Sequence, residues 1–98
     1  MSERRDVPWQ VYILRCADGT LYTGITNDLA RRLQQHRAGR ASRYTRSRLP
    51  VELVHSEPAR HRRAALRREA AIKALPRAQK LTLIANCRKR VGRTRRHA

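Results

Sequence analysis

The tripeptide Ala17-Asp18-Gly19 is the feature that most constrains how this chain can fold. It separates two apolar runs with strand character, residues 10–15 and 21–26, and Asp-Gly between two such runs is a strong signal for a β-hairpin. Each run carries a tyrosine, Tyr12 in the first and Tyr22 in the second. The geometry of the turn therefore decides whether the two phenol groups share one face of a sheet.

Two registers of this hairpin have different consequences for the tyrosines. A two-residue turn at Asp18-Gly19 would place Tyr12 opposite Ile25 and point the two phenols to opposite faces. A three-residue loop, with the glycine as a left-handed bulge, places Tyr12 opposite Gly24 and both phenols on one face. We expect the three-residue loop, in which the strand glycine leaves room beside the tyrosine ring. The alternative is a pair of ordinary strand tyrosines, half buried in a small core.

A helix and a basic loop are expected to follow the hairpin. Asn27 or Asp28 can cap a helix that runs through Ala38 and ends at Gly39. Residues 40–50 carry several arginines without apolar periodicity, and we expect them to form a loop.

The second half of the chain predicts one strand and two helices. Residues 51–55 alternate as a third strand, with Val51, Leu53 and His55 on one face and Glu52 and Val54 on the other. Pro58 is expected to open a helix over residues 59–75, because proline suits the first turn of a helix. Pro76 interrupts the pattern, which resumes over residues 77–87.

These elements predict a single small α/β domain over residues 9–87. Its core would be a three-stranded, mainly antiparallel sheet flanked by helices, which a chain of 98 residues can just accommodate. Residues 1–8 are expected to form an N-terminal arm. Residues 88–98 are nearly all basic or small and are expected to form a disordered tail.

The charge of the chain indicates a polyanionic partner. Lys and Arg total 24 against 7 Asp and Glu, which gives a formal net charge of +17. Such an excess attracts polyanions, and the guanidinium groups that dominate it can engage two phosphate oxygens at once. An anionic membrane surface is the competing polyanion, but no apolar run is long enough to span a bilayer or resembles a signal peptide. We therefore expect nucleic acid as the partner, no membrane association and a cytoplasmic location.

Four short segments occur in a diagnostic order: Val11-Tyr12-Ile13, Tyr22-Thr23-Gly24, residues 28–36 and residues 65–69. Together they resemble the GIY-YIG nuclease superfamily, and most closely its small stand-alone bacterial members. The resemblance covers the chain from about residue 9 to about residue 84 and implies a metal-dependent phosphodiesterase that acts on DNA rather than RNA. Valine and threonine replace a glycine and an isoleucine of the name-giving motif, but both tyrosines remain.

The resemblance implies roles for the two tyrosines and two helical residues. Arg32, ten residues after the second tyrosine, would contact the scissile phosphate, and His36 matches a histidine found in many members. The two lie one helical turn apart and share a face. We assign Tyr12 as the acceptor of the water proton and Tyr22 as the group that orients water or phosphate. An unperturbed tyrosine has a pKa near ~10, so neighbouring cations would have to lower it. The alternatives are a helix-surface histidine and a solvated arginine.

Glu69 is the last acidic residue of the chain, and helical spacing brings it to the edge of an apolar face. The resemblance gives it the role of metal ligand. Mg²⁺ usually takes one or two carboxylates and keeps waters or substrate phosphate oxygens. We therefore expect one Mg²⁺ or Mn²⁺ ion, weakly bound without substrate. The alternative is an ion pair with Lys73 at the i,i+4 spacing.

A further set of residues is expected to bind DNA without cutting it: Arg43, Tyr44, Arg46, Arg48 and Lys73. The alternative to a nuclease is a non-catalytic nucleic-acid-binding protein that uses the same basic surface, with its tyrosines packing or stacking. A basic structural protein of ribosomes or nucleoids would explain the charge equally well. It gives no reason for the ordered tyrosines, arginine and glutamate.

Overall fold

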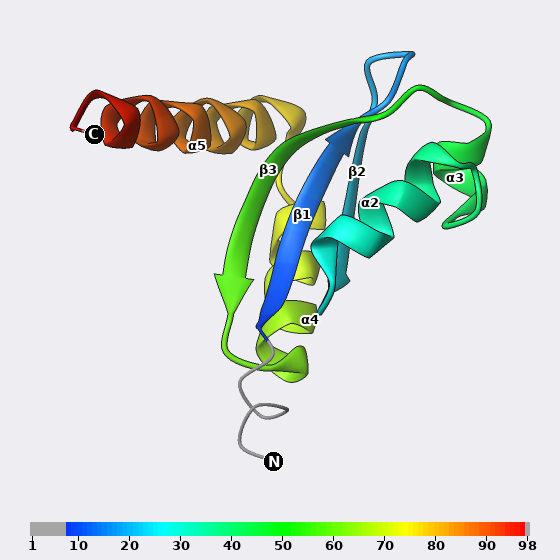
Figure 1. The fold of residues 1–98 in the computed structure, drawn as a ribbon, viewed down its shortest axis with the longest axis horizontal. Helices are drawn as coiled ribbons and strands as arrows, with labels where there is room; N and C mark the ends of the chain where they lie inside the picture. Colours follow the sequence, from blue (N-terminus) through cyan, green and yellow to red (C-terminus); the bar gives the residue numbers. More distant parts are fainter. Residues whose placement is uncertain (1–7, 98) are drawn as a thin grey trace.

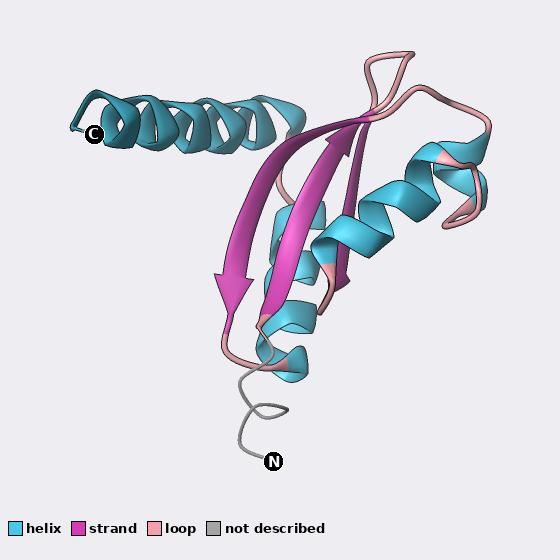
Figure 2. Ribbon diagram, viewed as in Figure 1, coloured by secondary structure: helices cyan, strands magenta, loops and turns pink. Residues whose placement is uncertain are grey.

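The computed structural model describes the backbone of residues 8–97 and the side chains of residues 8–87. The predicted N-terminal arm, except its last residue, lies outside the described residues. The elements follow the order β1 (Trp9–Arg15), β2 (Leu21–Thr26), α2 (Leu29–Arg37), α3 (Arg43–Arg46), β3 (Glu52–Ala59), α4 (Arg62–Lys73) and α5 (Arg77–His97). The predicted α/β class is confirmed, with a three-stranded antiparallel sheet flanked by helices (Figure 2).

The hairpin has the three-residue loop that the sequence predicts. Tyr12 pairs with Gly24 and Leu14 pairs with Tyr22. Gly19 adopts a φ of +86°, the left-handed conformation that this loop requires and that glycine adopts without a steric cost. Because cross-strand partners share a face, both phenols lie on the same side of the sheet. The predicted register is confirmed.

The sheet has the strand order β2-β1-β3, with α2 on one face and α4 on the other (Figure 1). Each face has its own hydrophobic cluster. The cluster under α4 is built on Val11, Ile13, Val54, Ala65, Ile72 and Ile84. The cluster on the α2 face is built on Tyr12, Leu14, Cys16 and Val51, with Tyr22, Leu29, Leu33 and Leu53 packed against it. The central strand therefore supplies both clusters, and β2 and β3 are the edges of the sheet.

Helix α2 begins and ends close to the predicted residues. The Asp28 side chain accepts a hydrogen bond from Arg31 N at 3.2 Å and caps the helix. Ala38 is the C-cap, and Gly39 follows with a φ of +76°.

The predicted loop over residues 40–50 contains a one-turn helix, α3, that the sequence did not predict. The Ser42 side chain caps it by accepting a hydrogen bond from Thr45 N at 3.1 Å. A helix of four residues is too short to show apolar periodicity, so only its capping serine was visible in the sequence.

The boundary between β3 and α4 was predicted wrongly. Strand β3 runs to Ala59 and includes Pro58, which lies opposite Gln10 instead of opening a helix. Helix α4 begins only at Arg62, and the His61 side chain caps it by accepting from Ala64 N. Proline is tolerated here because β3 is an edge strand, where a missing N–H need not break a ladder.

The predicted alternation along β3 is also wrong beyond Leu53. Leu14 pairs with Leu53, but Ile13 pairs with His55, so Val54 is an extra residue in a β-bulge. The bulge places Leu53 on the α2 face and His55 on the α4 face.

Helix α5 begins directly after Pro76, where the sequence predicts that the helical pattern resumes. Leu83 and Ile84 pack against the cluster under α4. The helical backbone continues past Cys87, the predicted end of the pattern, to His97. The division of the chain at residue 88 into a domain and a tail stays a prediction. None of the helices within residues 8–97 has the length and apolar character needed to cross a membrane.

Candidate active site

The phenol of Tyr12 lies directly over Gly24 on the neighbouring strand. A Cβ atom at residue 24 would stand 2.5 Å from Tyr12 Oη and 2.6 Å from its Cζ, far inside van der Waals contact. The ring is buried, with 1% of its surface exposed. Only glycine leaves room for the ring at this position, and the phenol is thereby carried from the central strand over the edge strand.

His36 connects this phenol to the short helix α3. Its Nε2 lies 2.9 Å from Tyr12 Oη, and its Nδ1 lies 2.9 Å from Thr45 Oγ1. Both His36 and Thr45 are fully buried, so the alternative of a helix-surface histidine is wrong. Burial, with a smaller contribution from Arg32, lowers the pKa of His36 from 6.5 to about 4. The imidazole is therefore neutral at neutral pH.

The surroundings of Thr45 favour one tautomer of His36. The Thr45 hydroxyl lies 3.4 Å from Ser42 O, to which it can only donate. It can then accept a hydrogen bond from His36 Nδ1–H, which leaves Nε2 as an acceptor. We therefore assign Tyr12 as the donor in the Tyr12–His36 hydrogen bond.

Tyr22 and Tyr44 complete an aromatic wall on the same face of the sheet. The Tyr22 ring lies edge-on to His36 at 5.3 Å and stacks on Tyr44 at 5.9 Å with an interplanar angle of 29°. Such arrangements are the favourable ones for aromatic pairs. Tyr44 comes from α3. This helix therefore contacts Tyr22 through Tyr44 and His36 through Thr45.

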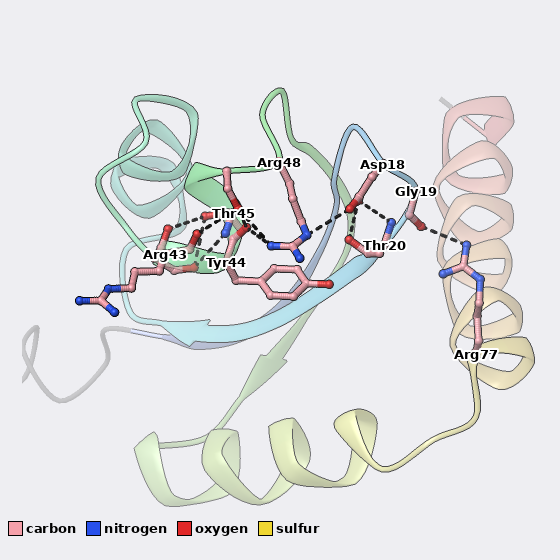
Figure 3. Close-up of polar contacts among 10 residues, drawn as sticks. Asp18, Gly19, Thr20, Arg43, Tyr44, Thr45, Arg48 and Arg77 are labelled. Atoms are coloured by element: carbon pink, nitrogen blue, oxygen red, sulfur yellow. Dashed lines mark hydrogen bonds and ion pairs between the residues drawn. The ribbon is translucent and has the colours of Figure 1, made fainter.

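An ion pair holds Tyr44 in place from the hairpin loop (Figure 3). Arg48 donates from Nε to Asp18 Oδ2 at 3.1 Å and from Nη1 to Tyr44 O at 2.9 Å. Its Cζ lies 3.9 Å from the centroid of the Tyr44 ring, within cation–π range. Hydrogen bonds from the Thr20 hydroxyl and amide, with a smaller contribution from Arg48, hold the pKa of Asp18 below its usual value. The loop that sets the hairpin register is thus tied to the aromatic wall.

The predicted DNA-binding residues differ in whether their side chains contact other residues of the protein. Arg43 and Arg46 are exposed on α3. Tyr44 and Arg48 contact the protein itself. Lys73 pairs with Glu69 at 3.5 Å.

Arg32 lies beside the Tyr12 phenol. Its Nη1 donates to Gln35 Oε1 at 3.1 Å, while its Nε is buried and has no hydrogen-bond partner among the described residues. Burial raises the pKa of Tyr12 above its usual value, and Arg32 lowers it only in part. The hypothesis from the sequence required a lowered pKa, so the direction in this structure is the opposite.

Glu69 lies on α4, the helix on the other face of the sheet. Its charge contributes to the raised pKa of Tyr12, which places the carboxylate within electrostatic reach of the phenol. Its side chain is 18% exposed and forms the i,i+4 ion pair with Lys73 that the sequence allowed. Because β2 is an edge strand, side chains from both faces can meet beside it.

The described residues hold no group of three or more His, Cys, Asp or Glu side chains that could bind a metal ion. A single half-buried carboxylate still fits the way proteins hold Mg²⁺, with water and substrate phosphate oxygens as the remaining ligands.

Three residues of this region were missed in the sequence: Thr45, Gln35 and Asp18. Asp18 was visible only as a turn residue, and its ion pair joins residues thirty positions apart. Thr45 follows a capping serine, but nothing in the local pattern connects it with His36.

The low pKa of His36 predicts that acid destabilises the fold. Between its folded value of about 4 and its usual value of 6.5, the unfolded chain binds more protons, so the free energy of unfolding falls with falling pH. The full shift corresponds to a loss on the order of 3 kcal/mol in the free energy of unfolding once His36 is protonated. We expect His36→Gln to be less stable than the native protein near pH 7 and to approach it near pH 4. Urea unfolding at several pH values measures this, and parallel pH profiles would contradict it.

Comparison with known proteins supports the resemblance seen in the sequence. The GIY-YIG catalytic domain family matches the chain over residues 8–82. A UPF0213 protein of Streptococcus agalactiae is 50% identical, covering 80% of this chain and 89% of the relative. A UPF0213 protein of Desulfotalea psychrophila is 54% identical, covering 78% of this chain and 70% of the relative.

The fold also matches a solved structure. The solution NMR structure of a UPF0213 protein from Bacillus halodurans is similar with a TM-score of 0.52 and 40% identity, covering 80% of this chain and 83% of that one. The matched residues include Tyr12, Tyr22, Arg32, His36 and Glu69. With a domain match over most of its length and relatives that are at least 50% identical over the aligned residues, this chain belongs to the GIY-YIG family.

Proposed function

We propose that this protein hydrolyses phosphodiester bonds in DNA with the help of one divalent metal ion. The observation that carries the proposal is the buried Tyr12–His36 hydrogen bond beside Arg32, with the Glu69 carboxylate within electrostatic reach. An acceptor for a water proton, a cation for a phosphate and a ligand for a hard metal would then meet at one edge of the sheet. Family membership supports the same chemistry.

Tyr12 would act together with His36 in the proton transfer. The raised pKa of Tyr12 disfavours a free phenolate in this buried site, so a proton gained by the phenol oxygen requires the release of its own. The Tyr12 oxygen can take a proton from the attacking water while its own proton passes to His36 Nε2. The water oxygen then forms its bond to phosphorus as the bond to the leaving oxygen breaks. A concerted transfer of this kind avoids a free phenolate.

Arg32 would stabilise the charge that develops on the phosphate. Its guanidinium lies beside the phenol, and its Nε has no partner among the described residues. Removing one preorganised donor of this kind typically costs about 10²–10³-fold in rate. Tyr22 would hold the His36 ring in position through their edge-on contact and orient water or phosphate.

Glu69 is the residue that would hold Mg²⁺ or Mn²⁺, which would supply stabilisation of the leaving oxygen. Binding the ion would require Glu69 to release Lys73, whose ammonium lies 3.5 Å away. With a single carboxylate, we propose weak metal binding in the absence of DNA.

A cleavage assay tests the proposed function. Supercoiled, branched and single-stranded DNA are incubated with the protein and Mg²⁺ or Mn²⁺, and then with a chelator. We expect cleavage of at least one substrate, loss of cleavage with chelator and loss with Arg32→Ala. Binding of all three substrates without any product would contradict the proposal. Because DNA is the proposed substrate, we propose the cytoplasm as the place of action.

The second candidate is a protein that binds DNA without cutting it. The Glu69–Lys73 ion pair favours it, because the pair occupies the carboxylate that a nuclease would need for the metal ion. The same assay separates the two candidates, since only a nuclease yields chelator-sensitive products.

The exposed arginines of α3 are expected to supply affinity without chemistry. On duplex DNA, log K falls with log salt with a slope of about −0.9 for each phosphate neutralised. We expect the double variant Arg43→Gln/Arg46→Gln to make this slope shallower by about 1–2 and to keep turnover at saturating DNA. Fluorescence anisotropy at several salt concentrations measures the slope. An unchanged slope would place the DNA on another surface.

A further inference from the structure

A cleft beside Arg32 is not used by the proposed chemistry. It has a volume of about 350 Å³, within the range of about 300–1,000 Å³ that is usual for ligand pockets. It lies where the start of β1, the end of β2 and the first turns of α2 meet. Its walls include Trp9, Ile25, Asn27, Arg31, Arg32 and Gln35. Because Arg32 belongs both to this cleft and to the candidate active site, the two are adjacent.

The walls of this cleft suit a nucleobase. Trp9 and Ile25 are only partly buried and offer an aromatic and an aliphatic surface. The amide of Gln35 is fixed by accepting a hydrogen bond from Arg32 at 3.1 Å, which leaves its nitrogen as a donor. Bases stack on aromatic side chains and present donors and acceptors along one edge. An aromatic surface and amide groups together match both properties.

Charges of both signs line the cleft, with Asp28 beside Arg31 and Arg32. The Asp28 carboxylate caps α2 by accepting from Arg31 N at 3.2 Å. Arg32 can bind the neighbouring phosphate. The remaining pair of Asp28 and Arg31 has no net formal charge, and this part of the cleft therefore suits an uncharged base. A base in a stacked duplex is covered on both faces, so a base that enters the cleft must be unpaired.

We propose that this cleft binds the base of an unpaired nucleotide next to the phosphate that is cut. The proposal rests on the proposed function for the position of that phosphate. It assigns the chain a preference for DNA with a single-stranded nucleotide at the cleavage position.

Trp9 allows a direct test because it is the only tryptophan of the chain. Its fluorescence is measured in chelator, so that no cleavage occurs, during titration with oligothymidylate. An abasic oligonucleotide of the same length, which carries the same phosphates without bases, is the matched ligand. We expect quenching by oligothymidylate, and much less by the abasic strand or a blunt duplex. Equal responses to oligothymidylate and the abasic strand, or no response to either, would overturn the proposal.

Two neighbouring glutamines provide matched variants. Gln35 lines the cleft, whereas Gln34 is exposed and lies outside it. Gln35→Ala should lower the ratio of affinities for oligothymidylate and the abasic strand, and Gln34→Ala should leave it unchanged. Trp9→Leu should lower the same ratio by about 5- to 150-fold, the usual effect of removing one stacking contact. Because Trp9 packs against the core, the thermal unfolding of the Trp9→Leu variant is measured as well, to show that the variant is folded. An equal ratio in Gln34→Ala and Gln35→Ala would contradict the proposal.

Failure of this inference can be distinguished from failure of the proposed function. Base-dependent quenching without cleavage under any metal condition would leave the cleft as a base-binding site and remove the nuclease proposal. Metal-dependent cleavage without base-dependent quenching would support the nuclease proposal and remove the base-binding cleft.

Discussion

Glu69→Gln is expected to abolish metal-dependent cleavage while DNA affinity stays equal or rises. The substitution keeps the size of the side chain and removes the charge that would hold the metal ion. Loss of several kcal/mol of transition-state stabilisation corresponds to a rate lower by about 10²-fold or more. Affinity should not fall, because a negative charge near the phosphates has been removed. Initial rates and anisotropy on the same DNA measure the two effects.

Lys73→Ala is the matched control for Glu69→Gln. Both variants remove the 3.5 Å ion pair, which is worth about 0.2–0.5 kcal/mol of stability at this spacing. If Glu69 acts on the chemistry, Lys73→Ala should weaken DNA binding but keep turnover at saturating DNA. Equal loss of turnover in both variants would show that the ion pair matters for folding and that Glu69 has no separate role.

Gly24→Ala is expected to inactivate the protein although residue 24 carries no chemistry. The new Cβ would stand 2.5 Å from Tyr12 Oη, so the ring would have to move away from its contact with His36. Forcing an extra methyl group into a packed site usually costs about 1–3 kcal/mol. We expect a loss of stability of this size together with a loss of cleavage. Urea unfolding and initial rates measure the two effects.

A double-mutant cycle tests whether this effect acts through the phenol. Tyr12→Phe removes the hydroxyl that donates to His36 but leaves the ring in place. If Gly24→Ala acts by displacing that hydroxyl, the double variant should cleave no more slowly than Tyr12→Phe alone, because the effects of coupled residues do not add. Losses of rate that multiply would mean that Gly24 acts on another part of the site.

The stacked Tyr22–Tyr44 pair and the Asp18–Arg48 ion pair give α3 a structural role that a basic loop would lack. Thr45 and Tyr44 are neighbours in this one-turn helix, and they contact His36 and Tyr22 respectively. A segment of four residues thereby holds His36 through Thr45 and Tyr22 through Tyr44. Arg43 and Arg46, which flank them, are exposed.

The sequence by itself determined the hairpin and what depends on it. The Asp-Gly turn set the register, the register placed Tyr12 over Gly24, and the spacing along α2 placed Arg32 and His36 on one face. These features could be predicted because each depends on residues close together in the chain, where turn chemistry and helical periodicity act directly.

Only the tertiary structure decided the remaining features of the site. The edge position of β3 allowed Pro58 to lie within a strand, and the bulge at Val54 sent His55 to the opposite face. The burial of His36 and the pairing of Asp18 with Arg48 depend on segments far apart in the sequence. Such contacts leave no local pattern, because their energy comes from packing and charge pairing that exist only once the chain has folded.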